Sequence, residues 1–152
     1  MTTPTFSSFC VGNERQVSRG VEQTESLGRR IAEAARPGDC VALIGDLGAG
    51  KTQLVRGLVG GLGGSTRQVC SPTFVLLNIY DTPRMRVFHL DAYRVAGPDD
   101  FEAIGFGELL GQGGLTVVEW ADRVEPLLPS PRLEVRLEVL GENERQIELA
   151  MR

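Results

Sequence analysis

A glycine-rich segment places the strongest constraint on how this chain folds. Residues 45–52 read Gly-Asp-Leu-Gly-Ala-Gly-Lys-Thr, and they follow directly after the apolar run Cys-Val-Ala-Leu-Ile at residues 40–44. Beyond Lys51, apolar residues recur at helical spacing, at positions 54, 55, 58, 59 and 62. Strand, glycine loop and helix occur in the order of a phosphate-binding loop with the pattern G-x-x-x-x-G-K-[ST]. The sequence therefore predicts an α/β fold that carries such a loop.

The chemistry of this loop follows from its glycines and its last two residues. Glycine lets backbone N–H groups converge on phosphate oxygens, while the following helix presents its positive end to the same anion. We expect Lys51 to reach the outer phosphates and the Thr52 hydroxyl to ligate Mg²⁺. The predicted ligand is ATP with Mg²⁺, and the predicted ATP-binding residues are Gly45, Asp46, Leu47, Gly48, Ala49, Gly50, Lys51, Thr52 and Gln53.

Two acidic residues stand at the ends of apolar runs. Asp91 follows residues 87–90, and Glu119 follows residues 115–118. Open α/β sheets bind ligands at the carboxyl ends of their strands, so carboxylates there can hold a metal ion directly or through water. Each acid alone is also compatible with a solvent-facing cap. Beside a phosphate loop, both are predicted metal ligands and, with Lys51, catalytic residues, and Glu119 could either ligate the metal or orient the attacking water.

Four further residues lie close to these acids, and the sequence leaves their roles open. His89, the only histidine, is either a packed strand residue or part of the site, and alone it makes no metal site. Arg94, directly after Tyr93, stabilises phosphate charge, contacts a partner or is merely solvated. Trp120 either flanks a nucleotide or belongs to the core.

Charge and cysteine content exclude several other classes. The net charge of −4 gives no general attraction for nucleic-acid phosphates, so DNA binding is not expected and any contact with RNA is expected to be indirect. Cys10, Cys40 and Cys70 form no C-x-x-C pair, which fits neither a disulfide framework nor a zinc site and favours the reducing cytoplasm. No run of about 18 apolar residues occurs, so no membrane-spanning helix is expected.

Length and patterning predict the remaining architecture. With 152 residues, the chain is expected to form one domain, with a core over about 20–130 and a C-terminal hairpin over about 132–151. The predicted fold is a three-layer, P-loop NTPase-like α/β sheet of mixed parallel and antiparallel strands with flanking helices. The expected elements are helices over 20–35 and 101–110, a buried strand over 115–119, antiparallel strands over 73–80 and 84–90 joined through Asp81-Thr82-Pro83, and an antiparallel hairpin of 132–140 with 144–151 at a sheet edge.

Several separated motifs together resemble one known family. Besides the loop at 45–52, the chain carries Ser-Pro-Thr-Phe at 71–74, His-Leu-Asp-Ala-Tyr-Arg at 89–94 and Glu-Trp at 119–120. In order and spacing these motifs resemble the TsaE family, formerly called YjeE, which comprises bacterial ATPases that assist the threonylcarbamoyladenosine modification of transfer RNA. The resemblance covers about residues 20–130.

The resemblance implies a small ATPase that joins the TsaB and TsaD proteins. Its own turnover is expected to be slow and to be stimulated by partners, while TsaD modifies the adenosine beside the anticodon. Carried over to this chain, Lys51 and Thr52 handle phosphate and magnesium, Glu119 supports the metal and hydrolysis, and Asp91 is a second acid near the metal. Thr24, near the start of the first helix, becomes a candidate neighbour of the adenine, although a helix N-terminal hydroxyl is the alternative. Residues that the resemblance marks as switch-like or partner-facing are Ser71, Pro72, Thr73, Phe74, His89, Tyr93, Arg94 and Trp120.

Other classes of protein use the same loop. A small-molecule kinase also needs a closing lid and an acceptor pocket, for which 152 residues leave little material. A GTPase is disfavoured because no Asn-Lys-x-Asp segment is present. A nucleotide-dependent adaptor, in which ATP organises a protein interface and hydrolysis ends the contact, stays open as an alternative.

Overall fold

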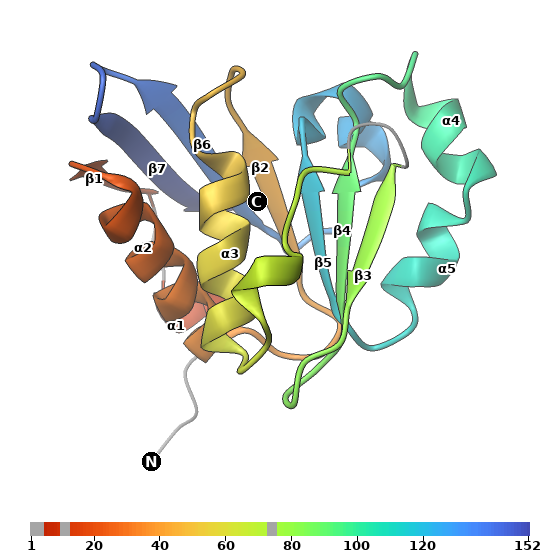
Figure 1. Cartoon of the computed structure of the whole chain (residues 1–152). Helices are drawn as coiled ribbons and strands as arrows, with labels where there is room; N and C mark the ends of the chain where they lie inside the picture. Colours follow the sequence, from red (N-terminus) through yellow and green to blue (C-terminus); the bar gives the residue numbers. More distant parts are fainter. Residues whose placement is uncertain (1–4, 10–12, 73–75) are drawn as a thin grey trace.

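The computed structural model describes residues 5–9, 13–72 and 76–152, and within them the strands form one seven-stranded sheet (Figure 1). The strand order is β1-β7-β6-β2-β5-β4-β3. The strands are β1 (Asn13–Ser18), β2 (Cys40–Ile44), β3 (Leu77–Tyr80), β4 (Val87–Asp91), β5 (Leu115–Glu119), β6 (Leu133–Val139) and β7 (Arg145–Met151).

Helices cover both faces of this sheet (Figure 1). Leu27 and Leu54 belong to helices that pack on one face, and Phe101 and Phe106 belong to helices that pack on the other. The predicted three-layer arrangement is therefore confirmed. The helices are α1 (Phe6–Phe9), α2 (Val21–Ala34) and α3 (Lys51–Gly61) on the first face and α4 (Pro98–Ala103) and α5 (Phe106–Leu110) on the second, with short 3₁₀ turns at Thr66–Gln68 and Ala121–Leu127.

The centre of the sheet is parallel, and this geometry positions the site. β2 pairs in parallel with β5 and with β6, and β5 pairs in parallel with β4. The carboxyl ends of β2, β5 and β4 therefore meet at one edge of the sheet. In this register Glu119 lies opposite Leu43 on one side and Asp91 on the other. Two acids thus leave the sheet beside the loop that follows β2.

Glycines allow α2 and α3 to approach each other closely. A Cβ atom on Gly57 of α3 would lie 2.0 Å from the carbonyl oxygen of Glu25, and one on Gly28 of α2 would lie 2.3 Å from that of Leu54. Contacts this short between a side chain and a backbone require glycine at both positions. The helix that begins at the glycine loop is thereby held directly against α2.

The structure corrects two of the sequence predictions and adds one strand. The helix expected over 101–110 is two helices, because Gly105 adopts a left-handed conformation with φ of +85° between α4 and α5. The C-terminal hairpin is antiparallel as predicted but does not form a sheet edge, since β6 pairs with β2 and β7 pairs with β1. β1 itself was not predicted.

Other expectations agree with the structure. β3 and β4 pair in an antiparallel fashion, although the turn between them extends to residue 86 and the predicted start of β3 at 73–75 lies outside the described residues. β2 and β5 span the predicted residues. No helix in the described part of the chain is long and apolar enough to cross a membrane.

Candidate functional site

The glycine loop connects β2 to α3 in a conformation that depends on its glycines. Gly50, the residue before α3, has a φ of +101°, which an L side chain rarely adopts. Lys51 then begins the helix and its side chain turns back to the loop, where Nζ donates to the carbonyl oxygens of Gly45 at 2.5 Å and Asp46 at 2.9 Å. The ammonium group is held at the place where a phosphate-binding loop would meet an anion.

Lys51 is a buried charge, with only 5% of its surface exposed. Burial lowers the pKa of Lys51 from its ordinary value, and the negative charges of Glu119, Asp91, Asp46 and Asp122 oppose this shift. Its ammonium nitrogen also lies 4.4 Å from the centre of the Trp120 ring, a cation–π distance. The surroundings of Lys51 are therefore acidic and aromatic, and in this structure loop carbonyls accept its hydrogen bonds.

Glu119 and Thr52 bring the end of β5 to the start of α3. The Thr52 hydroxyl donates to Glu119 Oε2 at 3.4 Å, and His89 Nε2 lies 2.6 Å from the same oxygen. Glu119 is 3% exposed. Its other oxygen, Oε1, makes no hydrogen bond within the described residues. One carboxylate oxygen is thus fixed by protein groups and the other has capacity for a ligand.

Asp91 uses both of its oxygens in hydrogen bonds. Oδ2 accepts from the Ser71 hydroxyl at 2.8 Å, and Oδ1 accepts from the Tyr93 backbone N–H at 2.8 Å. A carboxylate offers about four lone-pair sites, so these bonds still leave acceptor capacity. Asp91 therefore ties the segment around Ser71 to the end of β4 beside Glu119.

The oxygens of Thr52, Glu119 and Asp91 suit a cation that takes some of its ligands from the protein and the others from a bound molecule. Within the described residues, no three histidine, cysteine or acidic side chains form a cluster able to hold a metal ion by themselves. Mg²⁺ is commonly held by one or two protein oxygens together with waters and phosphate oxygens. Thr52, Glu119 and Asp91, the predicted metal ligands, fit that pattern.

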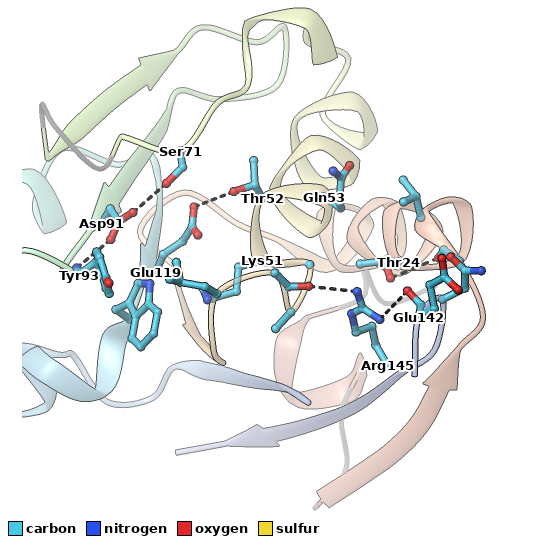
Figure 2. Close-up of a pocket in the computed structure, with 18 of the residues that line it drawn as sticks. Thr24, Lys51, Thr52, Gln53, Ser71, Asp91, Tyr93, Glu119, Glu142 and Arg145 are labelled. Carbon is cyan, nitrogen blue, oxygen red and sulfur yellow. Dashed lines mark hydrogen bonds between the residues drawn. The ribbon is translucent and has the colours of Figure 1, made fainter. Parts of the chain in front are cut away.

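A cavity of about 660 Å³ extends along the loop from these residues (Figure 2). At one end it reaches Glu119 and Asp91, and at the other it reaches the start of α2 and the turn between β6 and β7. A cavity of this shape suits an elongated ligand whose anionic part lies at Lys51. Its lining residues are Gly20, Val21, Thr24, Leu47, Gly48, Ala49, Gly50, Lys51, Thr52, Gln53, Ser71, Asp91, Tyr93, Arg94, Glu119, Trp120, Glu142, Asn143 and Arg145.

Arg145 is a site residue that the sequence interpretation missed. Its Nη2 donates to the carbonyl oxygen of Gly48 at 3.1 Å, and its Nη1 donates to those of Gly141 and Glu144, both at 2.9 Å. One guanidinium group thereby joins the β6–β7 turn to the glycine loop. Nothing in the local sequence around Arg145 indicates this contact, because it depends on how the hairpin joins the sheet.

Most of the other predicted residues lie in or beside the cavity. Gln53, Arg94 and Thr24 line it, and the Thr24 hydroxyl is 2.7 Å from that of Ser18. Tyr93 and Trp120 pack against each other with ring centres 4.9 Å apart and ring planes tilted by 42°.

Four predicted residues in the described part of the chain do not line this cavity, namely Gly45, Asp46, Pro72 and His89. His89 is completely buried and touches the site through Glu119. Thr73 and Phe74 lie outside the described residues, so their predicted role stays a prediction.

Comparisons with known proteins agree with this geometry. A family model described as threonylcarbamoyl adenosine biosynthesis protein TsaE matches residues 18–147. The tRNA threonylcarbamoyladenosine biosynthesis protein TsaE of Rickettsia felis is 41% identical over 124 residues, which make up 82% of this chain and 72% of that protein. The protein of the same name from Treponema pallidum is 39% identical over 136 residues, covering 90% of this chain and 99% of its own length.

The chain also resembles a solved structure. The crystal structure of YdiB from Bacillus subtilis superposes with a TM-score of 0.75 at 30% sequence identity, covering 93% of this chain and 87% of YdiB. The family match extends past residue 130 into the C-terminal hairpin, further than the resemblance read from the motifs. With a family match over most of its length, a P-loop NTPase-like sheet and the expected loop at the end of β2, this chain belongs to the TsaE family.

Proposed function

We propose that this protein binds and hydrolyses ATP with Mg²⁺ and thereby supports the threonylcarbamoyladenosine modification of transfer RNA. The observation that carries the proposal is the meeting of Thr52 and Glu119, 3.4 Å apart, beside Lys51 at one end of the cavity. The names of its relatives, which are tRNA threonylcarbamoyladenosine biosynthesis proteins, support the pathway.

Each residue at this end of the cavity has a role that its chemistry suits. Lys51 exchanges the carbonyl oxygens of Gly45 and Asp46 for phosphate oxygens. Thr52 supplies a hydroxyl ligand to Mg²⁺, which when bound neutralises charge that develops on the phosphates. Glu119 holds the metal or the attacking water through Oε1. Asp91 is the second acid near the metal, and its bonds with Ser71 and the Tyr93 backbone fix its orientation.

Partners are expected to complete this site. Phosphoryl transfer is catalysed mainly by positioning and charge stabilisation, and arginine side chains that reach the phosphates contribute strongly. Arg94 lines the cavity, and the guanidinium of Arg145 is already engaged by the carbonyl oxygens of Gly48, Gly141 and Glu144. We therefore propose weak intrinsic hydrolysis that the TsaB and TsaD proteins stimulate, with tRNA met only indirectly through that complex. Free thiols at Cys40 and Cys70 suit work in the reducing cytoplasm.

The test is tRNA modification over many turnovers. TsaB, TsaD, threonylcarbamoyl-adenylate and tRNA are combined with and without this protein and ATP, and threonylcarbamoyladenosine is measured. Repeated turnover should require the protein and should be lost with Lys51→Ala. If the protein makes no difference, the pathway assignment is wrong even where ATP binding persists.

The same assay separates the two alternatives. A nucleotide-dependent adaptor would support modification with a non-hydrolysable ATP analogue as well as with ATP, without partner-stimulated release of phosphate. A small-molecule kinase would transfer the phosphoryl group to an acceptor other than water. The amount of inorganic phosphate released for each ATP consumed distinguishes the kinase from the ATPase.

A further inference from the structure

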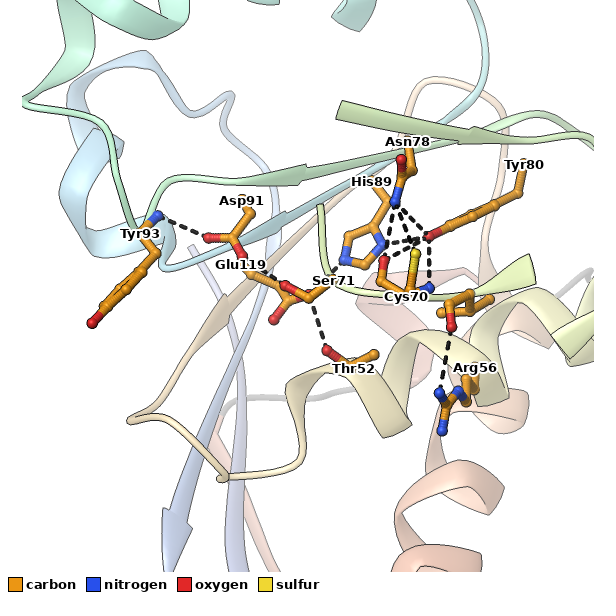
Figure 3. A network of polar contacts seen from close by, with 11 residues as sticks. Thr52, Arg56, Cys70, Ser71, Asn78, Tyr80, His89, Asp91, Tyr93 and Glu119 are labelled. Atoms are coloured by element: carbon orange, nitrogen blue, oxygen red, sulfur yellow. Dashed lines mark hydrogen bonds and ion pairs between the residues drawn. The ribbon is translucent and has the colours of Figure 1, made fainter. Parts of the chain in front are cut away.

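A buried chain of hydrogen bonds leaves the proposed site through Glu119 (Figure 3). His89 Nε2 lies 2.6 Å from Glu119 Oε2, and His89 Nδ1 lies 2.9 Å from the Tyr80 hydroxyl oxygen. The Tyr80 hydroxyl oxygen in turn lies 3.0 Å from the carbonyl oxygen of Cys70 and accepts from the Cys70 N–H at 3.3 Å. His89 is 0% exposed and Tyr80 is 3% exposed, so water does not compete for these bonds.

The chain ends on the segment that also reaches Asp91. Cys70 directly precedes Ser71, whose hydroxyl donates to Asp91 Oδ2 at 2.8 Å. The peptide at Cys70 and Ser71 is therefore connected to Glu119 through two side chains and to Asp91 through one. Asp91 thus contacts the side chain of Ser71, and Glu119 reaches the backbone of the neighbouring Cys70 through His89 and Tyr80 (Figure 3).

The Tyr80 hydroxyl can respond to a change at Glu119. A carboxylate only accepts, so His89 Nε2 donates to Glu119, and a ring that carries its hydrogen on Nε2 can accept from Tyr80 at Nδ1. The hydroxyl has a single proton but two acceptors at nearly equal distance, His89 Nδ1 and the Cys70 carbonyl. If Glu119 turns to another partner, the His89 ring loses the contact that holds Nδ1 against Tyr80, and the Tyr80 hydroxyl then donates to the Cys70 carbonyl.

We propose that His89 and Tyr80 are positioning residues that couple the Glu119 carboxylate to the backbone of Cys70 and Ser71. Occupation of the site by Mg²⁺ and ATP changes what Glu119 faces, and the two side chains pass this change to the segment. The inference rests on the proposed function, because it needs a ligand at Glu119. It gives the protein a means to report the state of its nucleotide on a surface that a partner can touch.

The thiol of Cys70 provides a direct readout. Cys70 is exposed, whereas Cys40 is buried and its pKa is raised to about 12 by burial, so Cys40 reacts slowly with thiol reagents at neutral pH. The experiment uses a Cys10→Ser background, which removes the third cysteine of the chain. The rate of Cys70 alkylation by N-ethylmaleimide is then measured with Mg²⁺ alone and with Mg²⁺ and a non-hydrolysable ATP analogue. We expect the analogue to change this rate by about fivefold, the effect of one net hydrogen bond on an equilibrium.

Two variants interrupt the chain at different links. Tyr80→Phe removes only the hydroxyl. His89→Gln keeps an N–H donor for Glu119 but has no second nitrogen for Tyr80. In both, we expect the analogue to bind with affinity within about twofold of the parent protein, while its effect on the Cys70 rate is lost. His89→Gln also serves if Tyr80→Phe does not fold.

Arg56→Ala is the control. Arg56 Nη2 donates to the carbonyl oxygen of Val69, the residue before Cys70, at 3.4 Å, and in the described part of the chain it makes no hydrogen bond with Tyr80 or His89. This variant should raise the Cys70 rate at all times and keep the response to the analogue, which a merely structural role for Tyr80 would not predict.

The possible failures are distinguishable. If calorimetry detects no binding of the analogue to the parent protein, the proposed function fails. If the analogue binds but leaves the Cys70 rate unchanged, or changes it equally in Tyr80→Phe, the coupling is wrong.

Discussion

The Thr52 hydroxyl lies 3.4 Å from Glu119 Oε2, although the two residues are 67 positions apart in the chain. Thr52 is the second residue of α3, the helix after the glycine loop, and Glu119 ends the parallel strand next to β2. Because the two side chains meet, a cation that Thr52 holds is within reach of Glu119. Their contributions to hydrolysis should therefore depend on each other.

We expect Thr52→Ala and Glu119→Gln each to lower ATP hydrolysis by about 10²–10³-fold, since each removes one contact to the metal or the attacking water. Combined, they should cost little more than the more harmful single change, because groups that act as a unit are not additive. Thr52→Ser keeps the hydroxyl and serves as the control. Steady-state hydrolysis at varied Mg²⁺ concentration measures all four variants. Fully multiplicative losses would mean that the two residues act independently.

Local sequence signals were sufficient for the centre of the fold. β2 and β5 are short continuous apolar runs that are buried on both faces, so their limits were predicted to the residue. The glycine loop between β2 and α3 follows from a motif whose physical demands are strict. Because the acids at 91 and 119 stand at strand ends, their approach to the loop could also be predicted.

Features that depend on distant pairing could not be predicted. β1 has the sequence Asn-Glu-Arg-Gln-Val-Ser with only Ser18 buried, so it lacks the apolar alternation that identifies a strand. Arg145 contacts Gly48 across 97 positions, and this contact exists only because β7 lies between β1 and β6. The role of His89 was left open for the same reason, since Tyr80 and Glu119 meet it from the strands on either side.

Lys51 should make ATP binding sensitive to alkaline pH. Its pKa is lowered by burial in the free protein, and phosphate oxygens beside the ammonium would raise it. Below both pKa values Lys51 is protonated in either state, so this group adds no pH dependence. As the pH rises through the lowered pKa, binding must take up a proton, and affinity should fall by up to about tenfold per pH unit.

The loss of affinity should begin below pH 10.5, the ordinary pKa of a lysine. Titration of ATP into the protein at a series of alkaline pH values measures it. Lys51→Arg is the control, because a guanidinium stays charged throughout this range. An equal loss of affinity in the arginine variant would assign the effect to another group.

Gly57→Ala should destabilise the fold without touching the cavity. The added Cβ would lie 2.0 Å from the carbonyl oxygen of Glu25, so α2 and α3 would have to separate. Overpacking of this kind costs about 1–3 kcal/mol in the free energy of unfolding. Urea unfolding should show a lower midpoint with an unchanged slope.

Gly107→Ala is the matched control for this prediction. Gly107 also lies in a helix, but no atom stands within 4 Å of its added Cβ. Alanine is the better helix former by about 0.5–1 kcal/mol, so this variant should be as stable as the parent or more stable. Equal destabilisation in both variants would contradict the close approach of α2 and α3 as the cause.

Arg145→Ala should weaken nucleotide binding through the shape of the loop. Without the guanidinium, the Gly48 carbonyl loses a hydrogen bond and the β6–β7 turn loses its tie to the loop. Because a loop that must be ordered on binding costs affinity, we expect the Kd for ATP and for tripolyphosphate to rise equally, by about tenfold. Arg136→Ala is the control, since Arg136 pairs with Glu134 at 3.1 Å and does not line the cavity. Calorimetry measures both ligands, and a loss confined to ATP would instead place Arg145 against the nucleoside.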